Sequence, residues 1–327
     1  MKVKTELIVQ HGKTFYWPVI EEGITWSTER KGAPGELSFK VVVDDKLNIT
    51  EGNGVIFKVN GVDVFYGFIF KLKRNKDHII TVTAYDQLRY LKNKDTYVYE
   101  GITAGQLIKR IADDYQLRTG ELEDTGYIIP SRIEDNSTLF DTIQTALDLT
   151  LQNKGKIYVM YDDFGKIMLK SLENMKVGDY KQGFLMIDQT TAQNFDYTST
   201  IDTQTYNKVK LTYDNDQTGQ REIYIAQSGD NMNKWGVLQY FDTLDKDENG
   251  QAKADALLSL YNSKTRNLTV KEAAGDLRVR GGSLVIINLK SKDIKYNQFM
   301  LVEKAKHTFK SGEHTMTLTL RGGDVVA

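Results

Sequence analysis

The chain has 327 residues, which is enough for two or three domains that each bury a core. Its 43 Lys and Arg residues balance 44 Asp and Glu residues, and a net charge of −1 gives no basic surplus for nonspecific nucleic-acid binding. The absence of cysteine excludes disulfides and thiolate metal sites, and it fits a reducing compartment.

Residues 1–93 are predicted to form a small antiparallel β-barrel. Short strand candidates at residues 4–9 and 15–20 come first, and a third at 37–43 follows a Gly-Ala-Pro-Gly turn. Residues 54–91 then read as three strands in a row, in which Asn60-Gly61 supplies the positive φ angles of a tight hairpin turn. About six strands are enough to close a small barrel.

Residues 94–190 are expected to form an α+β insert, as one domain or as two subdomains. Thr103 and Gln106 make a capping-box pattern, after which apolar residues recur at helical spacing as far as residue 115. A second helix is predicted from Ser137 or Thr138 to Gly155. A short strand at 127–130 lies between the helices, and a hairpin of residues 157–161 and 166–172 follows them.

Residues 191–327 are predicted to form a second barrel with a helix inserted near 252–263. Strands are expected at 208–213, 222–227, 237–241 and 267–271. From Gly282 to Leu320 the three-strand pattern of residues 54–91 returns and ends in a strictly alternating strand. The predicted fold is therefore mainly β (α+β), with two similar small antiparallel, tube-like β-barrels and the α+β insert between them.

Two segments have the composition of ligand-binding loops. Asp245, Asp247, Asn249 and Gly250 match the first half of a calcium loop, but Ala256 stands where the bidentate carboxylate belongs, so a polar loop before a helix is favoured. Residues 275–282 are glycine-rich with two arginines. A phosphate cradle needs its glycines to open a helix, whereas these open a strand, so we expect an exposed or interface loop.

The titratable residues show no catalytic or metal-binding pattern. Neither the histidine spacing nor the adjacent acids, which we expect in turns or on an exposed helix face, predict convergence on one site. G-x-S-x-G, H-E-x-x-H and Walker motifs are absent. We therefore predict no catalytic, cofactor-binding or metal-binding residues, no cofactor and no enzymatic activity. The candidates weighed were His11, His78, His307 and His314, and the pairs Asp44-Asp45, Asp113-Asp114 and Asp162-Asp163.

The order of several segments resembles the XkdQ/YqbQ family of contractile-tail proteins from PBSX-like prophages. Through that family it resembles late control protein D, the T-even phage hub and the N-terminal part of the VgrG spike. The resemblance covers essentially the full length. The segments that carry it are residues 83–91 (TAYDQLRYL), the helix at 102–115, residues 275–277, 282–285 and 299–307, and the final alternating strand.

The resemblance implies a structural baseplate hub. It would be a homotrimer whose two barrels per subunit make a pseudo-six-fold ring that joins the hexameric tail tube to the trimeric spike. The implied partners are the tail tube protein, the spike or tip protein, LysM-bearing and wedge baseplate proteins, and the tape measure protein as a further candidate. No β-helix needle is present up to Ala327, so the spike tip is expected to be another protein.

The expected location is the tail baseplate of a virion or tailocin particle assembled in the host cytoplasm. The first residues lack a signal-peptide pattern, and no apolar run approaches the ~18 residues of a membrane span, so membrane insertion is not expected. Sequence-specific nucleic-acid binding is not expected either.

Two alternatives stay open at this point. One is a tail-associated peptidoglycan hydrolase whose site residues are scattered in sequence. The other is a carbohydrate- or receptor-binding baseplate module, because aromatic side chains could stack on sugars, although core and interface packing is the favoured interpretation of them. The aromatic residues in question are Trp17, Trp26, Tyr97, Tyr99 and Trp235.

Overall fold

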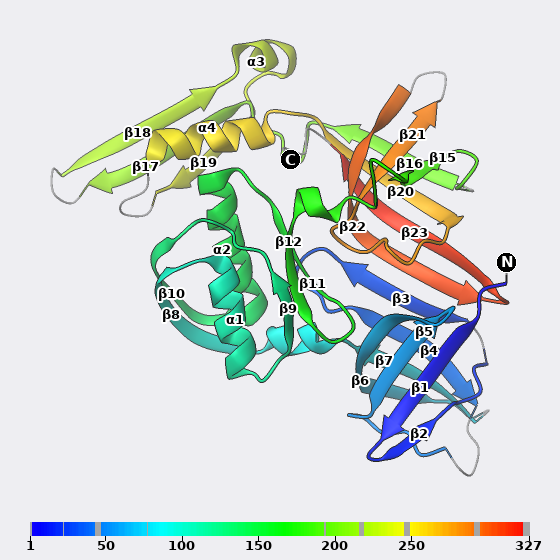
Figure 1. The fold of residues 1–327 in the computed structure, drawn as a ribbon. Helices are drawn as coiled ribbons and strands as arrows, with labels where there is room; N and C mark the ends of the chain where they lie inside the picture. Colours follow the sequence, from blue (N-terminus) through cyan, green and yellow to red (C-terminus); the bar gives the residue numbers. More distant parts are fainter. Residues whose placement is uncertain are drawn as a thin grey trace.

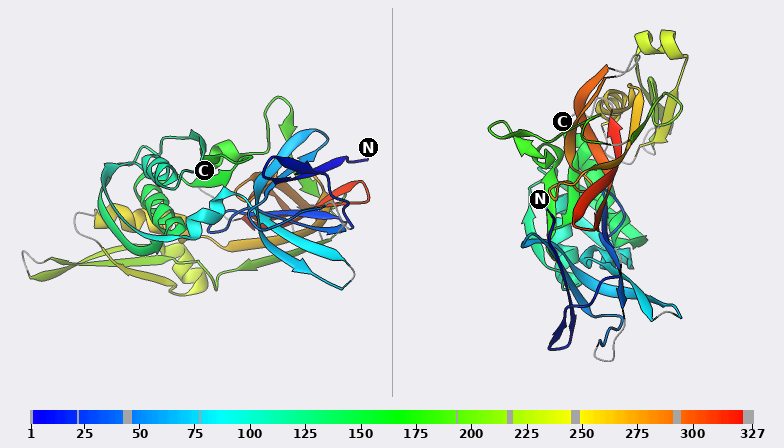
Figure 2. Two further views of the ribbon diagram at one scale, coloured as in Figure 1. Left: turned by 90° about the horizontal axis from the view of Figure 1, so that it is seen from below. Right: turned by 90° about the vertical axis from the view of Figure 1, so that its right-hand side faces the viewer.

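The computed structural model describes residues 2–21, 23–42, 47–76, 78–192, 194–215, 219–244, 249–290 and 295–322. Strands dominate, and the chain is elongated, with the first β module and the β17–β18 hairpin at opposite ends (Figures 1 and 2). The predicted mainly-β class is confirmed. No helix in the described part of the chain is long and apolar enough to span a membrane.

The first module begins the chain and contains the three consecutive strands that the sequence predicted. The Asn60-Gly61 turn has positive φ at both residues, 51° and 80°, which is the conformation that a tight hairpin requires. Side chains alternate, so Val55, Phe57 and Val59 are buried in the core. The strands are β1 (Thr5–His11), β2 (Thr14–Tyr16), β3 (Ile24–Glu29), β4 (Glu36–Val42), β5 (Gly54–Val59), β6 (Val62–Arg74) and β7 (Ile79–Tyr85).

The second module repeats this arrangement near the other end of the chain. Its strands run in the order β16-β20-β23-β22-β21, which matches β3-β4-β7-β6-β5 strand for strand. Even the irregularities correspond, since Phe70 forms a bulge between β6 and β7, and Glu303 forms one between β22 and β23. The strands are β15 (Met186–Asp188), β16 (Asn194–Thr200), β20 (Thr265–Ala274), β21 (Leu284–Lys290), β22 (Lys295–Lys310) and β23 (Glu313–Gly322).

The two modules differ from the prediction in one respect. We expected two separately closed barrels, but the pairings of the described strands give one 13-stranded sheet along an open path from β16 to β2. The physical reason is the length of β22. Its first half pairs with β21, and its second half, beyond the bulge at Glu303, pairs with β3 of the first module.

The insert follows the first module. The predicted capping box is present, with the Thr103 side chain accepting from the Gln106 backbone and the Gln106 side chain accepting from the Thr103 backbone. The second helix begins after Thr138 and ends at Gly155, whose φ of 68° is left-handed. The elements are η1 (Gln87–Lys92), β8 (Lys94–Ile102), α1 (Ala104–Asp114), β9 (Thr119–Leu122), β10 (Ile129–Thr138), α2 (Leu139–Lys154), β11 (Tyr158–Asp162), β12 (Ile167–Ser171), η2 (Leu172–Met175), β13 (Gly178–Asp179) and β14 (Gly183–Phe184).

A further layer lies between β16 and β20 in the sequence. We assigned its hairpin to the second barrel, but the hairpin belongs to a separate sheet in the order β18-β17-β19, covered on one face by α4 (Figure 1). Leu257 of α4 packs on Val209 and Leu211, which gives this layer a core of its own. The elements are β17 (Lys208–Asn215), β18 (Gln220–Gln227), α3 (Gly229–Trp235), β19 (Gln239–Thr243) and α4 (Gly250–Tyr261).

Candidate functional site at the module junction

The junction of the two modules is the pairing of β22 with β3. Antiparallel partners run from Lys304 opposite Glu29 to Phe309 opposite Ile24. The Lys304 Nζ atom lies 2.6 Å from Glu29 Oε1 across the pair. A continuous backbone ladder thus joins strands that are more than 270 residues apart in sequence.

His307 lies at the centre of this junction and is fully buried. Its ring stacks on Trp26 of β3 at 4.7 Å between centroids. The Nε2 atom is 2.9 Å from the Val279 carbonyl, and Nδ1 is 2.9 Å from Nε2 of His314. A carbonyl can only accept, so Nε2 of His307 carries the proton, and Nδ1 accepts from His314.

This arrangement keeps both imidazoles neutral. Burial, with His314 beside it, lowers the pKa of His307 to about 3. Burial also lowers the pKa of His314 to about 4. Imidazoles with pKa values this low stay neutral at pH 7. They can therefore pack in a core, but they are poorly suited to general acid–base catalysis at that pH.

Arg280 comes from the glycine-rich loop and enters the same junction from the second module. Its Nη1 donates to the Asp162 carbonyl at 2.8 Å, and its guanidinium lies 4.6 Å from the Tyr161 ring centroid. The neighbouring Gly281 is needed for this approach, because a Cβ there would lie 2.4 Å from the Glu29 carbonyl carbon. Arg278, by contrast, is exposed and pairs with Asp276 at 2.6 Å.

Two acids, the buried Asp86 and the partly buried Asp162, complete the junction. Asp86 accepts from the backbone of Gly35 at 2.8 Å and of Leu88 at 3.0 Å. Asp162 accepts from Gly165 and from the Gln87 amide.

Burial, with Asp162 nearby, raises the pKa of Asp86 well above its usual value, and burial raises that of Asp162 to about 6. Raised carboxyl pKa values are typical of glycosidase acids. The cavity beside these two acids has a volume of only about 20 Å³, which accommodates one water molecule and no sugar. The geometry therefore favours a structural role for the pair.

The other candidate residues are not brought together. His11 contacts Asn53, Asp113 pairs with Lys109, and Asp114 accepts from the Tyr97 hydroxyl. Asp44-Asp45 and residues 245–248 of the calcium-loop candidate lie outside the described residues. Within the described part of the chain, no group of three or more His, Asp or Glu could hold a metal ion.

The aromatic residues proposed for sugar stacking are also dispersed. Trp26 is buried at the junction, and Tyr97 and Tyr99 are buried in the core of the insert. Trp17 is 63% exposed in the first module, and Trp235 lies in α3, at the opposite end of the molecule (Figure 1). These five residues therefore offer no shared stacking surface.

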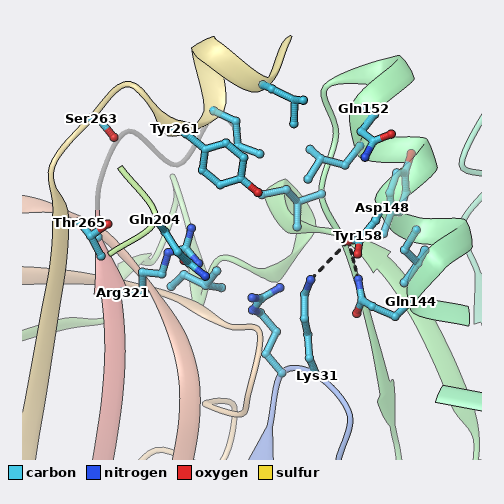
Figure 3. Close-up of a pocket in the computed structure, with 18 of the residues that line it drawn as sticks. Lys31, Gln144, Asp148, Gln152, Tyr158, Gln204, Tyr261, Ser263, Thr265 and Arg321 are labelled. Atoms are coloured by element: carbon cyan, nitrogen blue, oxygen red, sulfur yellow. Dashed lines mark hydrogen bonds and ion pairs between the residues drawn. The ribbon is translucent and has the colours of Figure 1, made fainter. Parts of the chain in front are cut away.

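Sequence reasoning missed a cavity of about 430 Å³ next to the junction (Figure 3). It lies where α2 and α4 meet the residues after β3, the middle of β22 and the end of β23. Its lining includes Arg30, Lys31, Asp148, Tyr261 and Arg321. These residues are too far apart in sequence to form a recognisable motif.

Several strand edges remain without a strand partner among the described residues, and two of them lie at corresponding places in the two modules. One is the outer edge of β16, at the end of the 13-stranded sheet. The other is the part of β6 from Lys71 to Arg74, where β5 no longer covers it. Unpaired edges are surfaces to which further strands add.

Comparison with known proteins identifies the relatives of this chain. A family model described as YQBQ-like matches residues 24–321. The phage-like element PBSX protein XkdQ of Bacillus subtilis (strain 168) is 30% identical over 317 residues, covering 93% of each chain. The protein YqbQ of the same organism is 29% identical, covering 94% of this chain and 93% of its own length.

A solved structure shares the fold. The 43 kDa tail protein of prophage MuSo2 from Shewanella oneidensis superposes with a TM-score of 0.66 at 11% identity, covering 96% of this chain and 98% of that one. At this identity the likeness concerns the fold alone. The arrangement described above is therefore also found in a prophage tail protein.

Proposed function

Since this chain belongs to the YQBQ-like family, we propose that it is the structural hub of a contractile-tail baseplate, in a phage, a prophage or a tailocin particle. Three copies form a ring that joins the hexameric tail tube to the trimeric spike. The role needs no chemistry, in keeping with the small cavity beside the junction acids.

The observation that carries this proposal is the β22–β3 junction between two modules of the same strand order. If copies associate by the same junction, β6 of one subunit pairs with β16 of the next, because β6 corresponds to β22 and β16 to β3. Both edges are without a strand partner among the described residues. Repeated three times, this heterologous contact gives six similar modules in a closed ring.

The intramolecular junction also predicts the register between subunits. Arg74 comes four residues after the bulge at Phe70, just as His307 comes four residues after the bulge at Glu303. Tyr197 of β16 pairs with Leu268 of β20. At the equivalent position of the first module, Trp26 of β3 pairs with Leu37 of β4. Arg74 of one subunit therefore lies opposite Tyr197 of the next, where a cation–π contact replaces the histidine stack.

The charges favour this pairing over the symmetric one. The free part of β6 carries Lys71, Lys73 and Arg74, which would repel a second copy of the same edge. Across the proposed pair, Lys73 faces the neutral Thr198 of β16. A β6–β16 contact propagates into a ring, whereas a β6–β6 contact would stop at a dimer.

The remaining parts of the chain would contact other tail proteins. We propose three parts, residues 1–93, 94–190 and 191–327, in which the two modules, without the separate layer of β17–β19 and α4, line the ring and the insert lies outside it. The proposed partners are the tail tube protein, the spike or tip protein, LysM-bearing and wedge proteins, and the tape measure protein. The protein would be located in the tail baseplate, after assembly in the host cytoplasm.

Solution mass and particle shape test the proposal. Native mass spectrometry of the purified chain, alone and co-expressed with the products of its neighbouring tail genes, should give about three times the 37.3 kDa subunit mass. Electron microscopy should show rings with six similar modules. A chain that stays monomeric in both preparations would contradict the hub.

A further inference from the structure

The cavity beside the junction is built from four separate parts of the fold. Lys31 enters it from the loop after β3, Asp148 from α2, Tyr261 from α4 and Arg321 from β23 (Figure 3). Its volume of about 430 Å³ lies in the range of ligand pockets and is large enough for several side chains.

Positive charge exceeds negative charge around this cavity. Glu303 is not part of the lining itself but forms ion pairs with two arginines that are. Its Oε2 atom lies 2.7 Å from Arg30 Nε, and its Oε1 atom lies 4.0 Å from Arg321 Nη1. Lys31 Nζ lies 3.4 Å from Asp148, and both of these side chains are nearly half exposed. Lys264 also lines the cavity, and no ion pair within the described residues includes it. Four cations thus face two carboxylates.

The pKa of Lys31 lies below its ordinary value, chiefly because partial burial disfavours its charged form; the neighbouring Arg30 adds to this effect and Asp148 opposes it. A bound anion would raise this pKa again. Arginine and lysine clusters of this kind recognise acidic peptide motifs.

The rest of the lining favours a peptide over a simple inorganic anion. Leu147 and Leu151 of α2 face Leu257 and Leu260 of α4, so one side of the cavity is apolar. The lining therefore fits an apolar side chain and carboxylates together.

We propose that this cavity binds an acidic segment of a partner protein, with its carboxylates on Arg321, Lys264 and Lys31 and an apolar side chain between α2 and α4. Such a segment bridges the two modules, the insert and the α4 layer. Binding would therefore fix these parts relative to one another, whatever the oligomeric state of the chain.

Selection from a displayed library of random eight-residue peptides on the full chain tests this site without a known partner. Enriched peptides should carry Asp or Glu beside a leucine-like residue. An Arg321→Gln, Lys264→Gln double variant should bind them at least tenfold more weakly, and affinity should fall with added salt. Arg278→Gln, which removes an exposed arginine paired elsewhere with Asp276, should leave binding unchanged.

Three outcomes would overturn the proposal. The first is that the selected peptides are not enriched in Asp or Glu. The second is that the selected peptides bind the double variant as tightly as the wild-type chain. The third is displacement of the peptides by inorganic phosphate or citrate at concentrations equal to the peptide Kd, which would make the site one for small anions. Because each readout uses the isolated chain, failure here leaves the trimer proposal separately testable.

Discussion

Acidification should open the module junction at His307. The folded state holds this imidazole neutral with a pKa of about 3, whereas an unfolded histidine titrates near 6.5. The unfolded state therefore binds more protons between these values, so stability contributed by the buried neutral ring is lost as pH falls below about 6.5.

The magnitude follows from the linkage relation. Between pH 7 and pH 4 the unfolded histidine gains nearly one proton and the folded one gains almost none. Each pKa unit is worth about 1.4 kcal/mol, so the loss over this range is about 3 kcal/mol. His307→Gln removes this term, and its amide can still donate to the Val279 carbonyl and accept from His314.

Trp26 provides the assay because it stacks on His307. In a Trp17→Phe, Trp235→Phe background, its fluorescence reports unfolding of the junction in urea at pH 7 and pH 4. The wild-type junction should lose about 3 kcal/mol more than the His307→Gln junction over this range. Equal losses in the two proteins would refute the buried neutral imidazole as the source, and His78→Gln, in an exposed turn, is the matched control.

Three further substitutions test the local physics. Gly281→Ala should destabilise the junction by about 1–3 kcal/mol in urea unfolding, because its Cβ would meet the Glu29 backbone, whereas Gly229→Ala, with open space around it, should not. Asp162→Asn should gain about 2 kcal/mol relative to wild type between pH 4 and pH 7, because stability is lost as an acid of raised pKa ionises; a pH-independent difference would contradict this. Thr103→Ala should cost about 1 kcal/mol by loss of the cap, and no change would show that the cap is replaceable.

Local patterns in the sequence predicted the elements of the modules well. Asn60-Gly61 fixes a hairpin turn whatever surrounds it, and the alternation of Met316, Leu318 and Leu320 marks one buried strand face. The capping box at Thr103 likewise depends on residues three apart. These features are short-range, so sequence alone reveals them.

Pairings between distant strands could not be predicted in the same way. The alternation of residues 208–213 indicates a strand but does not say which sheet receives it, and the structure places β17 in the α4 layer. Similarly, nothing near Glu303 shows that β22 changes partner from β21 to β3. The cavity beside the junction combines residues from 30 to 322, which no local motif connects.

Strand β8 was missed although its signal was present. Tyr97 and Tyr99 alternate with exposed residues and are buried against the insert helices. The helical pattern that follows, in α1, is the stronger signal in this part of the sequence. A two-residue aromatic alternation is a weak signal until a partner strand, here β10, is known.

Cross-linking between subunits tests the proposed ring most directly. The native sequence has no cysteine, so only the introduced cysteines can form disulfides. A Lys73→Cys, Thr198→Cys variant should form disulfide-linked dimers and then a trimer on oxidation, but no larger species. The equivalent intramolecular pair, Ser27→Cys with Lys306→Cys, should oxidise within one chain and stay monomeric. If the control oxidises and the first variant gives no covalent trimer, β6 does not pair with β16 and the account of the ring is wrong.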